Sequence, residues 1–76
     1  MTKDERLLEK LLNPDKNGVS DWKYRKELEQ AGVKIGNGCP AIRKTSALRK
    51  KYIIEEDRES SPGNAIDRIR FNGFIK

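Results

Sequence analysis

The chain has 76 residues, with 17 Lys and Arg against 12 Asp and Glu and a formal net charge of +5. Its length leaves room for one small core, so we expect a single domain over residues 1–76. One cysteine excludes an internal disulfide, and the lack of histidine excludes a zinc site and a His-based catalytic triad. Because no apolar run approaches the roughly 18 residues of a membrane span and the charged start is no signal peptide, we expect a cytoplasmic protein with no membrane partner.

The positive charge is concentrated in one segment. Residues 32–54 hold six Lys and Arg and no Asp or Glu, whereas residues 1–31 are balanced at seven against seven. Residues 55–76 have four basic and five acidic residues. A local excess of this kind indicates a polyanionic partner.

The first predicted helix covers residues 3–12. Thr2 and Glu5 have the spacing of a capping box, in which each side chain accepts a hydrogen bond from the other residue's amide. Leucines at positions 7, 8, 11 and 12 follow as one apolar stripe.

The next stretch, NPDKNGVSD, looks like the first half of a calcium-binding loop. Tyr24 stands where such a loop has its bidentate glutamate, and Asn13 is neutral, which leaves Asp15 and Asp21 as the only charged ligands. We therefore predict no metal and no cofactor. The stretch is instead expected to be a turn in which Ser20 caps a second helix.

This second predicted helix runs over residues 21–31. Val19 and Tyr24 have the spacing of a hydrophobic staple around the cap, and Gly32 stands where a helix would end. Trp22 lies off the apolar face of the helix, where shielding the edge of the core is favoured over stacking on a base.

The third predicted helix covers residues 40–51, with a start at Thr45 or Ser46 as the alternative. On a helical wheel its outward face has small residues at its centre and long cations around them. The fork of Arg43 suits a guanine edge, and the lysines suit phosphates. A solvated charged face is the plainer alternative, but five cations without an intervening acid favour nucleic acid. The predicted DNA-binding residues of this helix are Arg43, Lys44, Thr45, Ser46, Arg49, Lys50 and Lys51.

The remainder of the chain predicts a β-hairpin, with strand-like residues on both sides of the turn sequence SSPGN. Polar residues near its tip are candidate phosphate contacts, although four neighbouring acids oppose this and a solvated loop is the alternative. These candidates are Arg58, Ser60, Ser61, Asn64 and Arg68.

The order helix, helix, helix, hairpin resembles the winged helix-turn-helix DNA-binding fold over about residues 2–75, with AIRKTSALRKK and RESSPGNA in the places of the recognition helix and the wing. The resemblance implies an α+β, mainly α fold with three helices and a C-terminal β-hairpin. It also implies sequence-specific binding of double-stranded DNA, with the third helix in the major groove. The link at residues 32–39 is longer than that of a simple helix-turn-helix.

No catalytic site is predicted. Cys39 has no acid or base nearby in sequence and is expected to be a buried, inert thiol. The consecutive carboxylates Glu55, Glu56 and Asp57 would alternate faces in a strand.

We therefore expect a DNA-binding domain in one of two settings: a small regulator of transcription from a phage or mobile element, or the recognition domain of a larger enzyme such as a restriction endonuclease. A homodimer and covalent attachment to a larger protein both remain open. The alternatives are a protein interaction module with an acidic partner and an RNA-binding domain.

Overall fold

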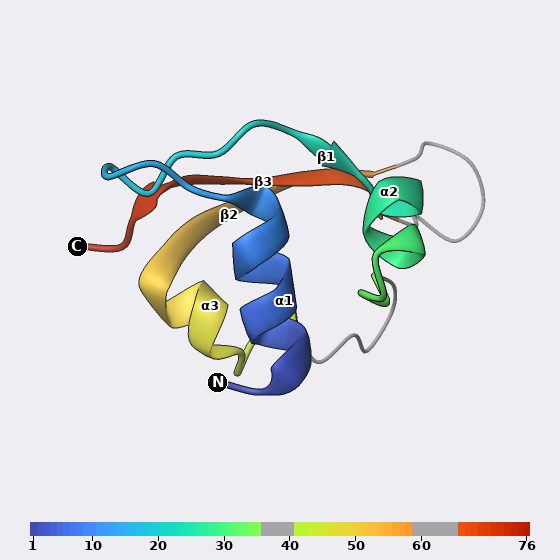
Figure 1. Cartoon of the computed structure of the whole chain (residues 1–76). Helices are drawn as coiled ribbons and strands as arrows, with labels where there is room; N and C mark the ends of the chain where they lie inside the picture. Colours follow the sequence, from blue (N-terminus) through green and yellow to red (C-terminus); the bar gives the residue numbers. More distant parts are fainter. Residues whose placement is uncertain (36–40, 59–65) are drawn as a thin grey trace.

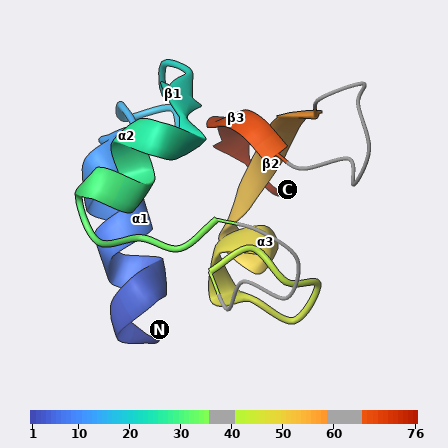
Figure 2. The same ribbon diagram turned by 90° about the vertical axis from the view of Figure 1, so that its right-hand side faces the viewer.

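The computed structural model describes residues 1–35, 41–58 and 66–76. One antiparallel sheet has the strand order β1-β3-β2, so that the last strand in sequence is the central one. Helices α1 and α3 lie on the same side of this sheet (Figures 1 and 2). The elements in chain order are α1 (Lys3–Leu12), β1 (Lys23–Tyr24), α2 (Arg25–Gln30), α3 (Ala47–Lys51), β2 (Tyr52–Arg58) and β3 (Ile66–Phe74).

The first helix, α1, agrees with the prediction from sequence, including its capping box. The Thr2 amide donates to the Glu5 carboxylate at 3.0 Å, and the Glu5 amide donates to the Thr2 hydroxyl at 3.3 Å. Leu8 and Leu12 are buried, and Asn13 ends the helix in the left-handed conformation. The predicted helix over residues 3–12 is confirmed.

The second helix, α2, is shorter than predicted and begins at Arg25. Lys23 and Tyr24 form β1 and pair with β3, so the predicted helix over residues 21–31 is wrong over residues 21–24, as is its staple, and correct over residues 25–30. Ser20 does not cap a helix, because its hydroxyl accepts a hydrogen bond of 2.9 Å from the Phe71 amide. Antiparallel pairing with β3 satisfies backbone groups of this segment in place of an extra helical turn. The predicted end at Gly32 is confirmed by its positive φ of 101° just after the helix.

The third helix, α3, begins at Ala47, so the predicted helix over residues 40–51 is wrong over residues 41–46, while residue 40 lies outside the described residues. Residues 41–46 form turns instead. Ala41 and Ile42 are both buried, although consecutive residues of a helix point about 100° apart. From this turn both side chains enter the core. The alternative start is the correct one, since the Ser46 hydroxyl caps α3 by accepting from the Leu48 amide at 3.2 Å.

The predicted hairpin is present as β2 and β3, which pair from Tyr52 with Phe74 to Arg58 with Ile66. β1 extends it to a three-stranded sheet, so that strand residues are nearly as many as helical residues in the described part of the chain. In addition, α3 has only five residues and is about 7.5 Å long, whereas the predicted recognition helix covers residues 40–51. The prediction of a mainly α winged helix-turn-helix fold is therefore wrong.

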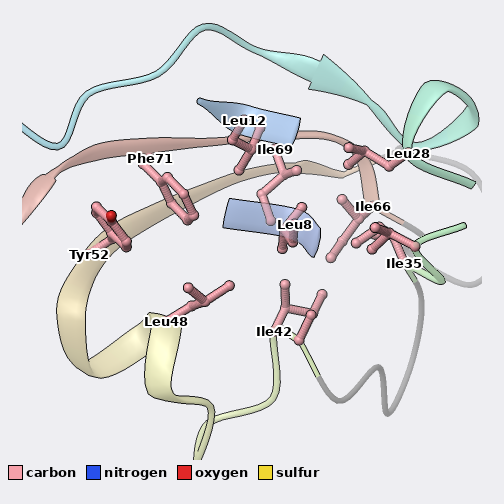
Figure 3. Packing of buried hydrophobic residues seen from close by; sticks show 12 residues of the cluster. Leu8, Leu12, Leu28, Ile35, Ile42, Leu48, Tyr52, Ile66, Ile69 and Phe71 are labelled. Carbon is pink, nitrogen blue, oxygen red and sulfur yellow. The ribbon is translucent and has the colours of Figure 1, made fainter. Parts of the chain in front are cut away.

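The core lies between the sheet and the helices (Figure 3). Leu8 of α1 and Leu48 of α3 are fully buried and face residues of β3. At one end the rings of Tyr52 and Phe71 stack with their centroids 4.1 Å apart. The remaining buried residues of the cluster are Leu12, Leu28, Val33, Ile35, Ala41, Ile42, Ile66 and Ile69.

Candidate nucleic-acid interface

The basic segment is held against α1 by one buried carboxylate. Glu5 accepts hydrogen bonds from the Ser46 hydroxyl at 3.0 Å and from the Ala47 amide at 2.7 Å. The Ser46 hydroxyl is also 2.7 Å from the carbonyl oxygen of Ala41. These contacts fix the turn at residues 41–46 and the start of α3 beside the start of α1.

The same contacts set the acidity of Glu5. Hydrogen bonds from the Thr2 backbone first, and from the Thr2 and Ser46 hydroxyls and the Ala47 amide, lower its pKa from 4.5 to about 2, against the opposing effect of burial. Glu5 is therefore ionised at neutral pH, and its charge lies at the start of α3, where the helix dipole favours an anion.

A second contact joins the other ends of these helices. The carboxylate of Glu9 accepts from the Tyr52 hydroxyl at 2.6 Å and from the ammonium group of Lys51 at 2.9 Å. The hydrogen bond from Tyr52 is the main cause of a lowered pKa for Glu9, with a further contribution from Lys51. Lys51 is consequently an ion-pair partner of α1, although its side chain is exposed.

Besides Lys51, four of the predicted contact residues are exposed on this segment. Arg43, Lys44 and Thr45 project from the turn, and Lys50 projects from α3. Within the described part of the chain, the three cations among them make no side-chain hydrogen bond or ion pair. Their charges are thus available to a partner.

Two other predicted residues of the segment have contacts inside the protein. Ser46 is buried and its hydroxyl is occupied as described above. Arg49 donates to the carbonyl oxygen of Ile42 at 2.6 Å and forms an ion pair with Glu56 of β2. Both side chains therefore hold α3 to its neighbours.

The arginines of the hairpin are also paired. Arg58 lies 2.5 Å from the Glu56 carboxylate, and Arg68 lies 2.7 Å from that of Asp57. Arg70 is paired with Glu55 in the same way, at 2.7 Å. The predicted residues Ser60, Ser61 and Asn64 lie outside the described residues, as does Cys39.

Trp22 is a half-buried residue beside the sheet rather than part of the core cluster. The guanidinium carbons of Arg68 and Arg70 lie 4.3 and 4.9 Å from the centre of its ring. Cation–π contact and ion pairing together hold these two arginines in place. The positive charges beside Trp22 are therefore paired with the carboxylates of Asp57 and Glu55.

In the loop whose sequence looks like a calcium site, the carboxylate of Asp15 binds backbone amides of the same loop. The Asp15 carboxylate accepts from the amides of Asn17 at 2.8 Å and Val19 at 3.0 Å. Among the described residues, no three His, Cys, Asp or Glu side chains come together as a metal-binding group. No helix in the described ranges is long and apolar enough to span a membrane.

The sequence predicts only one of the two roles of Glu5. Its spacing from Thr2 predicts the capping box, and the structure adds the contact with Ser46, which is 41 residues away. Nothing local in the sequence marks this second role, because a carboxylate at a helix start is fully explained by the first.

Two comparisons relate the chain to known proteins. The model of a family described as "ICEA Protein" matches residues 2–76. The type II restriction enzyme NlaIII of Neisseria lactamica is 42% identical over 76 residues, covering 97% of this chain and 33% of the enzyme. The chain thus spans about a third of the length of this relative. Neither description names a winged helix-turn-helix protein or a transcription regulator. No solved structure matches.

Proposed function

The chain belongs to the ICEA protein family, and from this membership and its surface we propose that it binds double-stranded DNA through Arg43, Lys44, Thr45 and Lys50. Its relative is named a type II restriction enzyme, a class of protein that acts on DNA. The proposed contacts are those predicted from sequence that are exposed and have no side-chain partner among residues 1–35, 41–58 and 66–76.

The contrast between two sets of cations is the observation that carries this proposal. Arg68 and Arg70 of the sheet are each within 2.7 Å of a carboxylate, so phosphate binding there would have to break ion pairs. Arg43, Lys44 and Lys50 have no such competitor in the described part of the chain. Such cations can bind DNA phosphates and release counterions without breaking an ion pair inside the protein.

The four residues are suited to different contacts. Arg43 offers two parallel donors, which match the O6 and N7 acceptors of guanine in the major groove. Lys44 and Lys50 are flexible point charges that suit phosphate oxygens, and the Thr45 hydroxyl can donate to either. Because residues 41–46 are a turn, they would meet DNA as a loop fixed by Glu5 and not as a recognition helix.

The setting we propose is a DNA-recognition domain, with residues 1–76 forming one unit of a larger restriction enzyme or a chain that acts beside one. The relative is about three times as long as the matched region, which supports covalent attachment to further domains. The proposal concerns binding and assigns no cleavage step to these residues.

Titration of a labelled DNA duplex at several salt concentrations tests this function. Three to four phosphate contacts from these residues alone should make the logarithm of the binding constant fall with the logarithm of salt concentration with a slope of at least about 3 in magnitude. Arg43→Ala and Lys50→Ala should each weaken binding, whereas Lys16→Ala, an exposed lysine in the loop at residues 13–18, should not.

Absence of duplex binding by the wild type at low salt would contradict the proposal. A preference for an RNA helix or for an acidic polypeptide over DNA of equal charge would instead support the RNA-binding or the protein-interaction alternative. A loss with Arg43→Ala confined to one DNA sequence would identify base reading, while equal losses on all sequences would indicate phosphate contact.

A further inference from the structure

We propose that the outward face of α1 is a second part of the DNA-contacting surface, with Lys3, Arg6 and Lys10 contacting phosphates of the duplex bound by Arg43, Lys44 and Lys50. This inference rests on the proposed function and extends it to a region of the chain that is neutral overall, where charge counting along the sequence shows no excess.

These three cations share one stripe of α1. Their spacing of three and then four residues brings side chains to the same face of a helix. All three are exposed, and they make no ion pair or side-chain hydrogen bond within the described part of the chain. The opposite face of the helix carries the buried Leu8 and Leu12.

The acids of α1 are turned away from this stripe. Glu5 and Glu9 point toward α3, where hydrogen bonds and an ion pair occupy their carboxylates. Asp4 lies about 140° around the helix from Glu9, on the flank away from α3. Helix α1 has equal numbers of basic and acidic residues. Its solvent face is nevertheless positive, because Glu5 and Glu9 are occupied by contacts with α3.

Two contacts place this stripe next to the basic segment. Glu5 meets Ala47 and Glu9 meets Lys51, so α1 and α3 lie side by side and run in the same direction. Arg6 lies about 60° around α1 from Glu9, on the side away from the core.

On α3, Lys50 lies about 100° from Lys51 and is exposed, whereas Leu48 faces the core. Arg6 and Lys50 therefore flank the contact between the two helices on its solvent side. Both views of the fold also place the start of α1 and the turn at residues 41–46 at the end of the molecule away from the sheet (Figures 1 and 2).

A surface with cations from two helices offers a duplex more phosphate contacts than a single turn does. Each phosphate contact contributes about −0.9 to the salt slope. Lowering the salt concentration from 1 M to 0.1 M therefore raises the affinity roughly eightfold for each contact. Two or three contacts from α1 would thus change affinity by roughly 60-fold to 500-fold.

The test compares two triple variants with the same change in charge. The first is Lys3→Gln, Arg6→Gln and Lys10→Gln, and the matched control is Lys16→Gln, Lys26→Gln and Lys76→Gln, three exposed lysines away from the proposed surface. The α1 variant should reduce the magnitude of the salt slope by about 2 to 3 and weaken duplex binding at 0.1 M salt by at least tenfold more than the control does. Arg6→Gln alone, with about one unit of slope lost, provides the same test if the triple variant is poorly folded.

Equal slopes and affinities for the α1 variant and the control would overturn this inference. In that case a loss of binding with Lys50→Ala would still support the proposed function. Failure of the wild type to bind duplex at low salt would overturn the proposed function itself, so the two failures are distinguishable.

Discussion

The hydroxyl group of Ser46 donates a hydrogen bond of 3.0 Å to the carboxylate of Glu5. The same carboxylate accepts from the amides of Thr2 at 3.0 Å and Ala47 at 2.7 Å. One side chain thus satisfies backbone amides at the start of two helices, groups that have no partner within a helix. The position of the basic turn relative to α1 depends on this carboxylate.

Replacing Glu5 with Gln should therefore destabilise the protein. The amide retains one oxygen but loses the charge and one set of acceptors, so we expect a loss of about 1.5 to 3 kcal/mol in the free energy of unfolding at pH 7. Urea denaturation measures this loss. Glu27→Gln is the control, because its ion pair with Lys23 is exposed and 4.0 Å long and should contribute less than about 1 kcal/mol. Equal stability of the two variants would contradict the role of Glu5.

The stability should also depend on acid pH through Glu5. Its pKa is about 2 in the folded protein against 4.5 ordinarily, so the stabilisation is fully present above about pH 4.5 and is lost as the pH falls toward 2. Unfolding free energies of the wild type should decrease across this range more steeply than those of Glu5→Gln. Parallel pH curves for the two proteins would show that Glu5 titrates normally in the native state.

Ser20 should stabilise the sheet rather than α2. Ser20→Ala leaves the Phe71 amide buried without its acceptor, which should cost about 1 to 3 kcal/mol. Hydrogen exchange distinguishes the two roles, since the Phe71 amide should exchange faster in the variant while the amides of α2 keep their rates relative to global unfolding. Selective acceleration within residues 25–30 would instead indicate a helix cap.

Gly18 and Gly32 form a matched pair for testing backbone and packing constraints. Both have positive φ, 79° and 101°, which costs an alanine about 1 to 2 kcal/mol. A Cβ at Gly18 would also lie 3.0 Å from the backbone nitrogen of Phe74, whereas the nearest atom at Gly32 is a Leu7 methyl at 3.7 Å. Gly18→Ala should therefore lower the melting temperature more than Gly32→Ala, and the reverse order would refute the close packing at Phe74.

Calcium should leave the thermal stability unchanged. The Asp15 carboxylate already accepts two backbone amides of its own loop, and Tyr24 takes the place of a bidentate ligand. Melting curves with millimolar calcium and with chelator should coincide, for the wild type and for Ser20→Ala. A rise of several degrees with calcium would mean that the loop binds the ion in the native state.

The sequence by itself determined the features that depend on neighbouring residues. The capping box of Thr2 and Glu5 and the leucine stripe were sufficient to predict α1, and Gly32 marked the end of α2. β-Branched and aromatic residues on either side of a turn sequence predicted the pairing of β2 with β3. Signals of this kind are reliable because the interacting groups lie only a few residues apart.

Only the tertiary structure decided where α2 and α3 begin. Ser20 and Ser46 are both good helix caps by residue type, yet Ser20 binds Phe71 of the sheet, and Ser46, which does cap α3, is also bound by Glu5 of α1. The exposed cations of α1 became part of a candidate surface only once Glu5 and Glu9 were seen to face α3. The physical reason is that a buried polar group takes whichever partner the packing of the core brings within hydrogen-bonding distance, and these partners are 41 to 51 residues away in sequence.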